Sequence, residues 1–271
     1  MKTGDRVQKQ TIEDFSQQWA AYSDNEGYYG SKEMFADMFH PLLRPEELKG
    51  ARVADIGSGA GRTVRMLIGA GVSRVLAIEP SRAIEVLREN TREYADRISY
   101  LNVAGDQIPP SGALDYVISV GVLHHIPEPV PTVAAAFRAL KPGGRMAIWI
   151  YGAEGNRCYL AVAKPLRALT TRLPHGLLVP LVWAFDCALV AYVQLCRFLP
   201  LPLRGYMREV VARLDGAKRR LTIYDQLNPA YAKYYTREEA GNLLTSAGFE
   251  DVRLHHRHGY SWAVIGTKPK G

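Results

Sequence analysis

With 271 residues, the chain has the length of one α/β domain that carries an insertion, and its hydrophobic fraction of 47% is ordinary for a globular protein. Its 34 lysines and arginines against 27 acidic residues give a net charge of +7. The polar residues 1–18 exclude a secretory signal peptide, and Cys158, Cys187 and Cys196 lack metal-ligand spacing, so we expect reduced core cysteines in a cytoplasmic protein.

Aromatic residues mark the first 50 residues, for which we expect a helical cap. Phe15 and Trp19 stand four residues apart, a spacing that gives a helix an apolar face. Tyr28 and Tyr29 follow before the first strand of the sheet. We therefore expect this cap to pack against the domain that begins at residue 51.

The most informative motif lies where this domain begins. An apolar run ends at Asp55 and is followed by glycines at every second position, Gly57, Gly59 and Gly61, and then by Arg62. Glycine lets the backbone turn tightly and lets a ligand approach where a Cβ would collide. The helix expected next would present free N–H groups at its start. The pattern predicts a nucleotide-type site at the carboxyl end of the first strand of an open α/β sheet.

The spacing of these glycines separates two kinds of nucleotide site. A dinucleotide fingerprint, Gly-x-Gly-x-x-Gly, would need a third glycine at the position of Arg62. The pattern present, Asp-x-Gly-x-Gly-x-Gly, resembles motif I of the class I S-adenosylmethionine (SAM) dependent methyltransferases. On the glycines alone, a tight turn that binds nothing remains an alternative.

The following 90 residues continue the resemblance. A strand at 74–78 ends in Glu79 and Pro80, and a carboxylate there can accept hydrogen bonds from both ribose hydroxyls. A third strand at 98–103 leads to Asp106 and Gln107, and the resemblance implies that Asp106 bonds the adenine amino group. A fourth strand at 114–120, a helix at 129–140, a Leu-Lys-Pro-Gly-Gly turn and a fifth strand at 146–151 are also typical of the family.

The end of the chain completes this fold. Thr236 and Glu239 form a capping box that opens a helix running to residue 246. Strands at 251–257 and 260–268 follow, and the short turn between them permits only an antiparallel pair. The family resemblance implies an α/β fold: a doubly wound, seven-stranded, mostly parallel sheet of order 3-2-1-4-5-7-6 with its last strand antiparallel and a helical insertion after strand five. The expected divisions are a helical cap at 1–50, the SAM-binding core at 51–151, the insertion at 152–220, and an acceptor loop with the last helix and two strands at 221–271.

The insertion is both basic and apolar. It holds eleven basic and four acidic residues, a balance of +7 that equals the net charge of the whole chain. Two helices are expected in it, at 158–173 and 177–199. The second nearly reaches transmembrane length, but Asp186 at its middle would cost about 2.5–3.5 kcal/mol in a bilayer. A single crossing would also separate strands that must share one sheet, so we reject a transmembrane helix.

Two interpretations of the insertion remain open. It is either a lid packed on the sheet domain or against a second copy of the chain, or an interfacial hairpin with basic flanks toward anionic lipid. Nucleic acid is not the expected partner, because the basic residues are dispersed through apolar sequence and form no solvated stripe. The fourth strand is followed by Gly121 and Val122, and not by the Asn/Asp-Pro-Pro-aromatic tetrad of enzymes that methylate DNA and RNA.

The resemblance implies SAM as the cofactor and S-adenosylhomocysteine as its product. We include Tyr28 and Tyr29 among the expected cofactor-binding residues because, in methyltransferases similar to this chain, a helix before the first strand folds over the cofactor. The residues expected to bind the cofactor are Asp55, Gly57, Ser58, Gly59, Gly61, Arg62, Glu79, Pro80, Asp106, Gln107, Val120, Tyr28 and Tyr29.

Methyl transfer requires an acceptor atom held in line behind the sulfonium methyl group, and a base helps when the acceptor must lose a proton. His124 and His125 follow the fourth strand, and consecutive residues in an irregular segment point different ways, so at most one should face the acceptor. Tyr224, Asp225 and Tyr235 belong to a polar, tyrosine-rich cluster at 224–235 that suits an acceptor pocket. Structural roles for all five residues are the alternative.

A third cluster, His255, His256 and His258, has no accompanying cysteine or carboxylate pattern, and we expect no metal site. Strand alternation predicts that His256 and His258 share a face.

The sequence thus favours a SAM-dependent methyltransferase that acts on a small, lipophilic acceptor, and it leaves an anionic membrane surface and a second copy of the chain both open as partners of the insertion. One alternative is a soluble sugar or secondary-metabolite methyltransferase whose insertion forms a lid or a homodimer contact. Another is a SAM-binding protein without catalysis.

Overall fold

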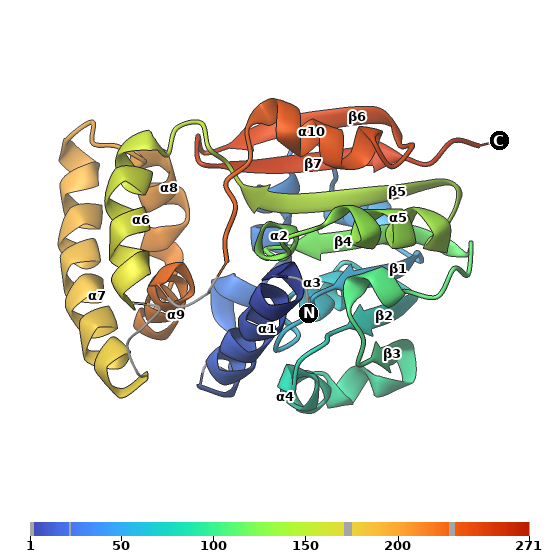
Figure 1. Cartoon of the computed structure of the whole chain (residues 1–271), viewed down its shortest axis with the longest axis horizontal. Helices are drawn as coiled ribbons and strands as arrows, with labels where there is room; N and C mark the ends of the chain where they lie inside the picture. Colours follow the sequence, from blue (N-terminus) through green and yellow to red (C-terminus); the bar gives the residue numbers. More distant parts are fainter. Residues whose placement is uncertain (1–2, 22, 171–174, 228–230, 271) are drawn as a thin grey trace.

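The computed structural model describes residues 3–21, 23–170, 175–227 and 231–270 (Figure 1). Seven strands form one sheet in the order β3-β2-β1-β4-β5-β7-β6. They are β1 Arg52–Ile56, β2 Arg74–Ile78, β3 Ile98–Leu101, β4 Leu114–Val120, β5 Leu140–Tyr151, β6 Glu250–Arg257 and β7 Ser261–Thr267. β7 runs antiparallel to both of its neighbours, and the other pairs are parallel. The predicted fold class and strand order are confirmed.

Helices cover both faces of the sheet. In β1, Val53 and the next three residues are all buried, as expected for a central parallel strand covered on both sides. Alternate residues enter two separate cores: Val53 packs in one core with helices α2, α3 and α4, and Ala54 packs in the other with α5 and α10. The helices of the domain are α1 Thr3–Ala21, α2 Lys32–Phe39, α3 Arg62–Gly69, α4 Ala83–Asn90, α5 Val130–Ala139 and α10 Arg237–Thr245.

Local signals account for several helix ends. Thr236 Oγ1 accepts a hydrogen bond from the Glu239 N–H at 3.2 Å, and the Glu239 carboxylate accepts one from the Thr236 N–H at 2.9 Å, so the predicted capping box is present. Ser31 caps α2 in a similar way by accepting from the Met34 N–H. Short 3₁₀ helices lie at Gly27–Gly30, Pro45–Leu48, Arg92–Arg97, Gly105–Gln107, Leu123–His125 and Val211–Arg213.

The insertion stands beyond the carboxyl ends of the parallel strands, with α7 outermost and α1 between it and the sheet (Figure 1). Its helices are α6 Arg157–Thr170, α7 His175–Phe198, α8 Arg204–Glu209 and α9 Gly216–Leu227. The predicted division after residue 220 is wrong, because it falls inside α9. Cys196 is buried as expected, whereas Cys187 is exposed on α7, so its predicted place in the core is also wrong.

Asp186 explains how α7 carries a carboxylate in an apolar sequence. Its side chain is 8% exposed and faces α9, where Arg219 Nε lies 2.8 Å and Arg220 Nη1 3.3 Å from its two oxygens. The charge therefore lies inside the helical unit and is paired there, as a buried carboxylate requires.

Candidate active site

The glycine loop follows β1 and leads into α3. Gly57 has a positive φ of 71°, and a Cβ on it would lie 2.4 Å from Val122 Cγ2. A Cβ on Gly59 would lie 2.9 Å from Trp19 Cε2, so this turn contacts the side chain that α1 lays over it. The loop thus needs glycine for its backbone conformation and for space.

Two carboxylates flank this loop, and they differ in their hydrogen bonding. The Glu79 carboxylate accepts hydrogen bonds from the N–H groups of Gly59, at 2.8 Å, and Ser81, at 2.9 Å. Asp55 is fully buried, and neither of its carboxylate oxygens has a hydrogen-bond partner among the described residues. Burial raises the pKa of Asp55 to about 7. An unpaired buried carboxylate is costly, so Asp55 favours a ligand that brings a cation or a hydrogen-bond donor.

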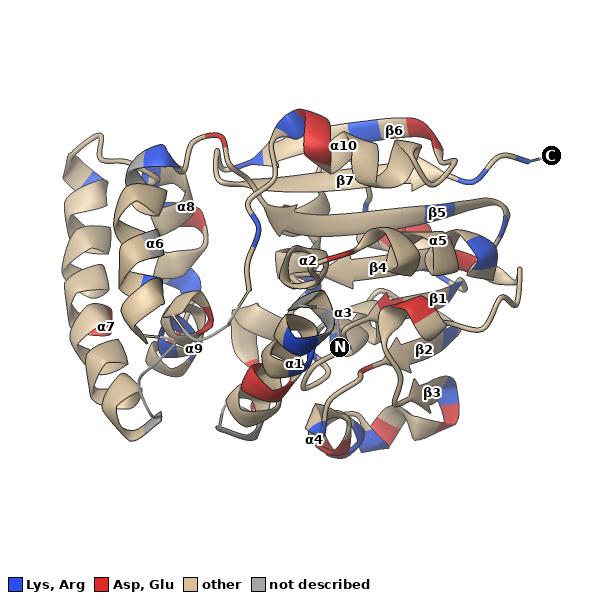
Figure 2. Cartoon of the chain, viewed as in Figure 1, with Lys and Arg blue, Asp and Glu red and all other residues tan. Residues whose placement is uncertain are grey.

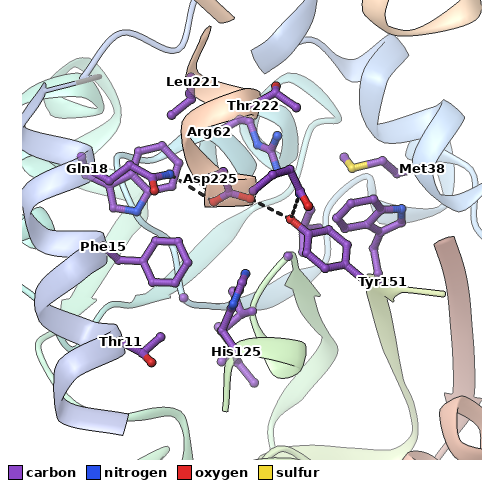
Figure 3. Close-up of a pocket in the computed structure, with 18 of the residues that line it drawn as sticks. Thr11, Phe15, Gln18, Met38, Arg62, His125, Tyr151, Leu221, Thr222 and Asp225 are labelled. Atoms are coloured by element: carbon purple, nitrogen blue, oxygen red, sulfur yellow. Dashed lines mark hydrogen bonds between the residues drawn. The ribbon is translucent and has the colours of Figure 1, made fainter. Parts of the chain in front are cut away.

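A cavity opens above this loop at the carboxyl ends of the strands (Figure 3). Six of the predicted cofactor residues line it: Gly57, Arg62, Glu79, Pro80, Val120 and Tyr29. Asp55, Ser58, Gly59 and Gly61 belong to the loop but not to the cavity wall.

The remaining predicted cofactor residues lie outside the wall. Asp106 and Gln107 are exposed, although the neighbouring Gly105 lines the cavity. Tyr28 faces the insertion instead, where the Arg213 guanidinium lies 3.7 Å from its ring centroid. Any contact of these three side chains with a cofactor stays a prediction.

His125 lines the cavity, and His124 does not. His125 Nδ1 lies 2.7 Å from the carbonyl oxygen of Tyr231. A carbonyl only accepts, so we assign the ring proton to Nδ1, which leaves a lone pair on Nε2. This Nε2 is buried without a partner among the described residues, and burial lowers the pKa of His125. His124 is buried against Tyr151, with ring centroids 3.7 Å apart.

Opposite His125, a polar network crosses the cavity wall (Figure 3). The Tyr151 hydroxyl donates to Asp225 Oδ2 at 2.7 Å and accepts from Gln226 Nε2 at 2.7 Å. Gln18 Nε2, from α1, donates to Asp225 Oδ1 at 3.1 Å. Both oxygens of Asp225 are thus held in place, and α1, β5 and α9 meet at this carboxylate.

Gln226 of the predicted tyrosine-rich cluster also lines the cavity, but the two tyrosines predicted as catalytic do not. Tyr224 is buried against Leu178 and Val182 of α7, and Tyr235 packs in the core with α10. Asp225 belongs to helix α9 and not to the expected loop, while residues 228–230 of the cluster lie outside the described residues. Of the five predicted catalytic residues, the structure brings only His125 and Asp225 to the cavity.

Several wall residues had no sequence signal of their own. One end of the cavity is lined by sulfur, aromatic and guanidinium side chains from four parts of the chain, namely Met34, Met38, Trp149, Tyr206, Arg257 and Tyr260. Arg257 is 2% exposed and is ion-paired with Asp37 of α2, while its Nη1 donates to the Tyr260 hydroxyl. Tyr151 also lines the cavity, and the sequence could have indicated it, because it ends the fifth strand at the edge of the sheet where the site was expected.

The histidine cluster is divided between two surroundings. His256 stacks on Trp262 with ring centroids 4.3 Å apart, whereas His258 Nε2 lies 2.8 Å from Asp37 Oδ1. The predicted shared face is wrong, because β6 ends at Arg257 and His258 turns with a φ of 47°. Within the described residues, no group of His, Cys, Asp or Glu has the arrangement of a metal site.

Comparison with known proteins bears on the same region. Residues 54–148 match the family model described as a methyltransferase domain. The chain therefore contains a methyltransferase domain in its central region. SAM is the cofactor of this domain, and two features fit it: the glycine loop, and the Asp55 carboxylate, which has no partner in the described part of the chain.

Two curated relatives match less than half of the chain. A tRNA U34 carboxymethyltransferase of Chromohalobacter salexigens is 34% identical over 122 residues, which cover 43% of this chain and 36% of the relative. A ubiquinone biosynthesis O-methyltransferase of Thiobacillus denitrificans is 30% identical over 135 residues, 48% of this chain and 56% of the relative. The chain thus spans about a third to a half of the length of these relatives.

Solved structures extend the likeness of fold over the whole chain. The 1,6-didemethyltoxoflavin-N1-methyltransferase of Burkholderia thailandensis, with 1,6-didemethyltoxoflavin and S-adenosylhomocysteine bound, superposes with a TM-score of 0.56 over 99% of this chain and 92% of that one. The two sequences are 13% identical, so this match supports the fold alone.

Proposed function

We propose that the chain is an enzyme that transfers the methyl group of SAM to a small, lipophilic acceptor that is held next to His125. The observation that carries the proposal is that His125 lies in the wall of the cavity above the glycine loop and that its Nε2 has no hydrogen-bond partner among the described residues. In this proposal His125 acts as the base that takes the proton from the acceptor.

The methyltransferase motif residues supply the cofactor half of this site. The turn at Gly57 would admit the cofactor, Glu79 would hold the ribose hydroxyls, and the buried carboxylate of Asp55 would attract the positively charged end of the molecule. When bound, SAM supplies an already activated methyl group, so the chain's main tasks are to position the acceptor and to exclude water.

His125 and Asp225 would have different roles at the acceptor. His125 Nδ1–H is held by the Tyr231 carbonyl, so Nε2 can accept the acceptor's proton as the methyl group is transferred. Asp225 already accepts from Tyr151 and Gln18 and would position the acceptor from the opposite wall. His124 has no access to the cavity wall and keeps a packing role in this scheme.

The walls favour a small apolar acceptor. Trp149, Tyr206 and Tyr260 present aromatic surface, and Met34 and Met38 add adaptable thioethers. A nucleic acid would have to extrude a base into a cavity that α1 and α9 partly cover. We therefore favour a small molecule over the RNA that one relative's name indicates.

Calorimetric titration with S-adenosylhomocysteine tests the cofactor half first. We expect micromolar binding to the wild type, at least tenfold weaker binding to Asp55→Ala and Glu79→Ala, and unchanged binding to a control, Glu93→Ala, whose carboxylate is exposed. No binding by a folded wild type would refute the proposal. Binding without turnover of any small lipophilic hydroxyl or amine compound would leave a non-catalytic SAM-binding protein.

The insertion supports a second element of the proposal, an anionic membrane surface as partner. The segment Gly176–Phe198 has a mean hydropathy of 1.9, and only 22% of it is buried. Along the outer side, α7 is almost free of charge (Figure 2). The large apolar side chains exposed in this region are Val162, Leu169, Leu177, Trp183, Val190, Leu195, Phe198 and Leu199. Exposed Arg157, Arg197, Arg208 and Arg213 give the same unit its positive charge.

An apolar face with basic neighbours suits the headgroup region of an anionic bilayer. We expect the protein to sediment with phosphatidylcholine vesicles that contain phosphatidylglycerol, and less so at high salt. Phe198→Asp should weaken this binding, whereas Val130→Asp, which changes an exposed apolar residue on α5, should not. A dimer that Phe198→Asp breaks, without vesicle binding, would instead favour a second copy of the chain and a soluble enzyme.

A further inference from the structure

Helix α9 makes contacts on two sides, one with α7 and the other with α1 and the residues that follow it. Three consecutive cations, Lys218, Arg219 and Arg220, lie in it, and neighbours on a helix point about 100° apart. Arg219 and Arg220 turn toward α7 and pair with Asp186. The Arg220 guanidinium also lies 3.8 Å from the ring centroid of Trp183, a residue of the exposed apolar face. One side of α9 is therefore joined to the helix that we place on lipid.

The other side of α9 is joined to the segment that covers the cavity. Lys218 is 4% exposed, and its Nζ lies 2.7 Å from Asp24 Oδ2 and also donates to the Asp24 carbonyl. Two turns further along, Asp225 accepts from Gln18 of α1 at 3.1 Å. These two contacts, Lys218 with Asp24 and Asp225 with Gln18, form what we call the clasp.

The clasped segment lies directly on the glycine loop. Trp19 contacts Gly59, and Asn25 Nδ2 donates to the Ala60 carbonyl at 2.6 Å. Gln18 is fully buried, and because its Nε2 faces Asp225, its Oε1 is left without a partner among the described residues. A ligand that brings a donor to Gln18 Oε1 would add to the contacts that hold α1 closed.

We propose that α9 couples the outer face of α7 to the clasp, so that an anionic lipid surface on α7 favours the closed cofactor site. This inference rests on the proposed function and adds its regulation. Contacts run without a break from Asp186 through α9 to Asp24 and Gln18, and from there to the glycine loop. Thermodynamic linkage makes the effect reciprocal, so a ligand in the cofactor site strengthens lipid binding by the same factor.

Titration with S-adenosylhomocysteine, with and without phosphatidylglycerol-containing vesicles, tests the coupling on the full chain. We expect the vesicles to tighten binding to the wild type about fivefold, within the usual range of coupling between sites. Lys218→Met cuts the clasp and keeps an apolar stem, so this variant should bind vesicles as before but lose the response. Lys218→Arg keeps the positive charge and should keep the response to vesicles. A general loss of packing at this buried position would instead affect both variants.

Arg138→Met is the control, because it removes an exposed cation of α5, outside the insertion, and should keep the response. Asp186→Asn weakens the contact between α7 and α9 and should lose it. Equal affinity with and without bound vesicles, or a full response in Lys218→Met, would overturn the coupling. Absence of vesicle binding would overturn it too, while ligand binding in solution would still support the methyltransferase; absence of ligand binding by the wild type would refute both.

Discussion

A single backbone carbonyl determines which nitrogen of the His125 ring carries the proton. Its Nδ1 is hydrogen-bonded to the Tyr231 carbonyl, and the Phe15 ring packs against it at a centroid distance of 4.8 Å. Burial is the main cause that lowers the pKa of His125 below that of a free imidazole, 6.5, although the nearby Asp225 carboxylate opposes it. The ring is therefore neutral at physiological pH, as a general base must be.

This shift predicts the pH dependence of the reaction. The rate constant kcat/KM should rise with pH through an apparent pKa below 6.5 and then stay level, because protonated His125 cannot act as a base. His125→Gln should lower kcat by about 10²–10⁴ and leave S-adenosylhomocysteine binding unchanged. Retention of the acidic limb in His125→Gln would show that another group titrates.

Asp55 yields a prediction about stability. Its pKa is raised to about 7 in the folded protein by burial, so between roughly pH 4 and 7 the folded state holds a proton that the unfolded state has lost. Stability of the ligand-free protein should therefore fall as pH rises through this window, by about 1.4 kcal/mol per pH unit from this group.

Asp55→Asn removes this titration and keeps the shape of the side chain. We expect it to raise the melting temperature of the ligand-free protein at pH 8 relative to the wild type, and to weaken S-adenosylhomocysteine binding. Glu93→Gln, an exposed control, should change neither. Thermal unfolding measured between pH 5 and pH 8 checks the prediction, and identical profiles for wild type and Asp55→Asn would contradict it.

At the scale of elements, the strand, loop and helix around Gly57 could be predicted because their signals are local. The glycine spacing, the carboxylate of Glu79 and the capping box at Thr236 each depend on a few consecutive residues, and the structure contains each of these turns. Strand order followed from the family resemblance.

The glycine loop also permits a matched pair of substitutions. Gly57 and Gly50 have nearly the same φ, 71° and 74°, but a Cβ on Gly57 would overlap Val122, whereas nothing lies within 4 Å of a Cβ on Gly50. Both alanine variants should lose about 1–2 kcal/mol of stability from the left-handed backbone. Only Gly57→Ala should also weaken S-adenosylhomocysteine binding more than tenfold in calorimetry. Equal effects on binding would show that the loop does not contact the cofactor.

The acceptor half of the site was harder to predict because it depends on contacts between distant elements. The sequence marked Asp225 as a candidate for the acceptor pocket, and Asp225 does line the cavity, but its hydrogen-bond partner Tyr151 lies 74 residues away in the chain. Gln18 is 207 residues from Asp225 and stands in a segment whose pattern indicated only an apolar helix face. Short-range spacing carries no information on which side of α1 meets α9.

At the scale of the whole molecule, the N-terminal helix and the insertion close over a site built by the central domain. α1 supplies Phe15, Gln18 and Trp19, while α9 supplies Asp225, and the two helices touch through the clasp. A ligand bound beneath them should therefore hold together parts of the chain that are far apart in sequence.

Hydrogen exchange gives the last prediction. Saturating S-adenosylhomocysteine should slow amide exchange in α1 and α9 as well as in the glycine loop, because the ligand favours the closed clasp over local opening. The outer turns of α7 should exchange at the same rate with and without ligand when no vesicles are present. In Lys218→Met, α1 should exchange faster and gain less protection, since Asp24 has lost its ion pair. Protection confined to the glycine loop in the wild type would mean that α1 closes independently of the cofactor.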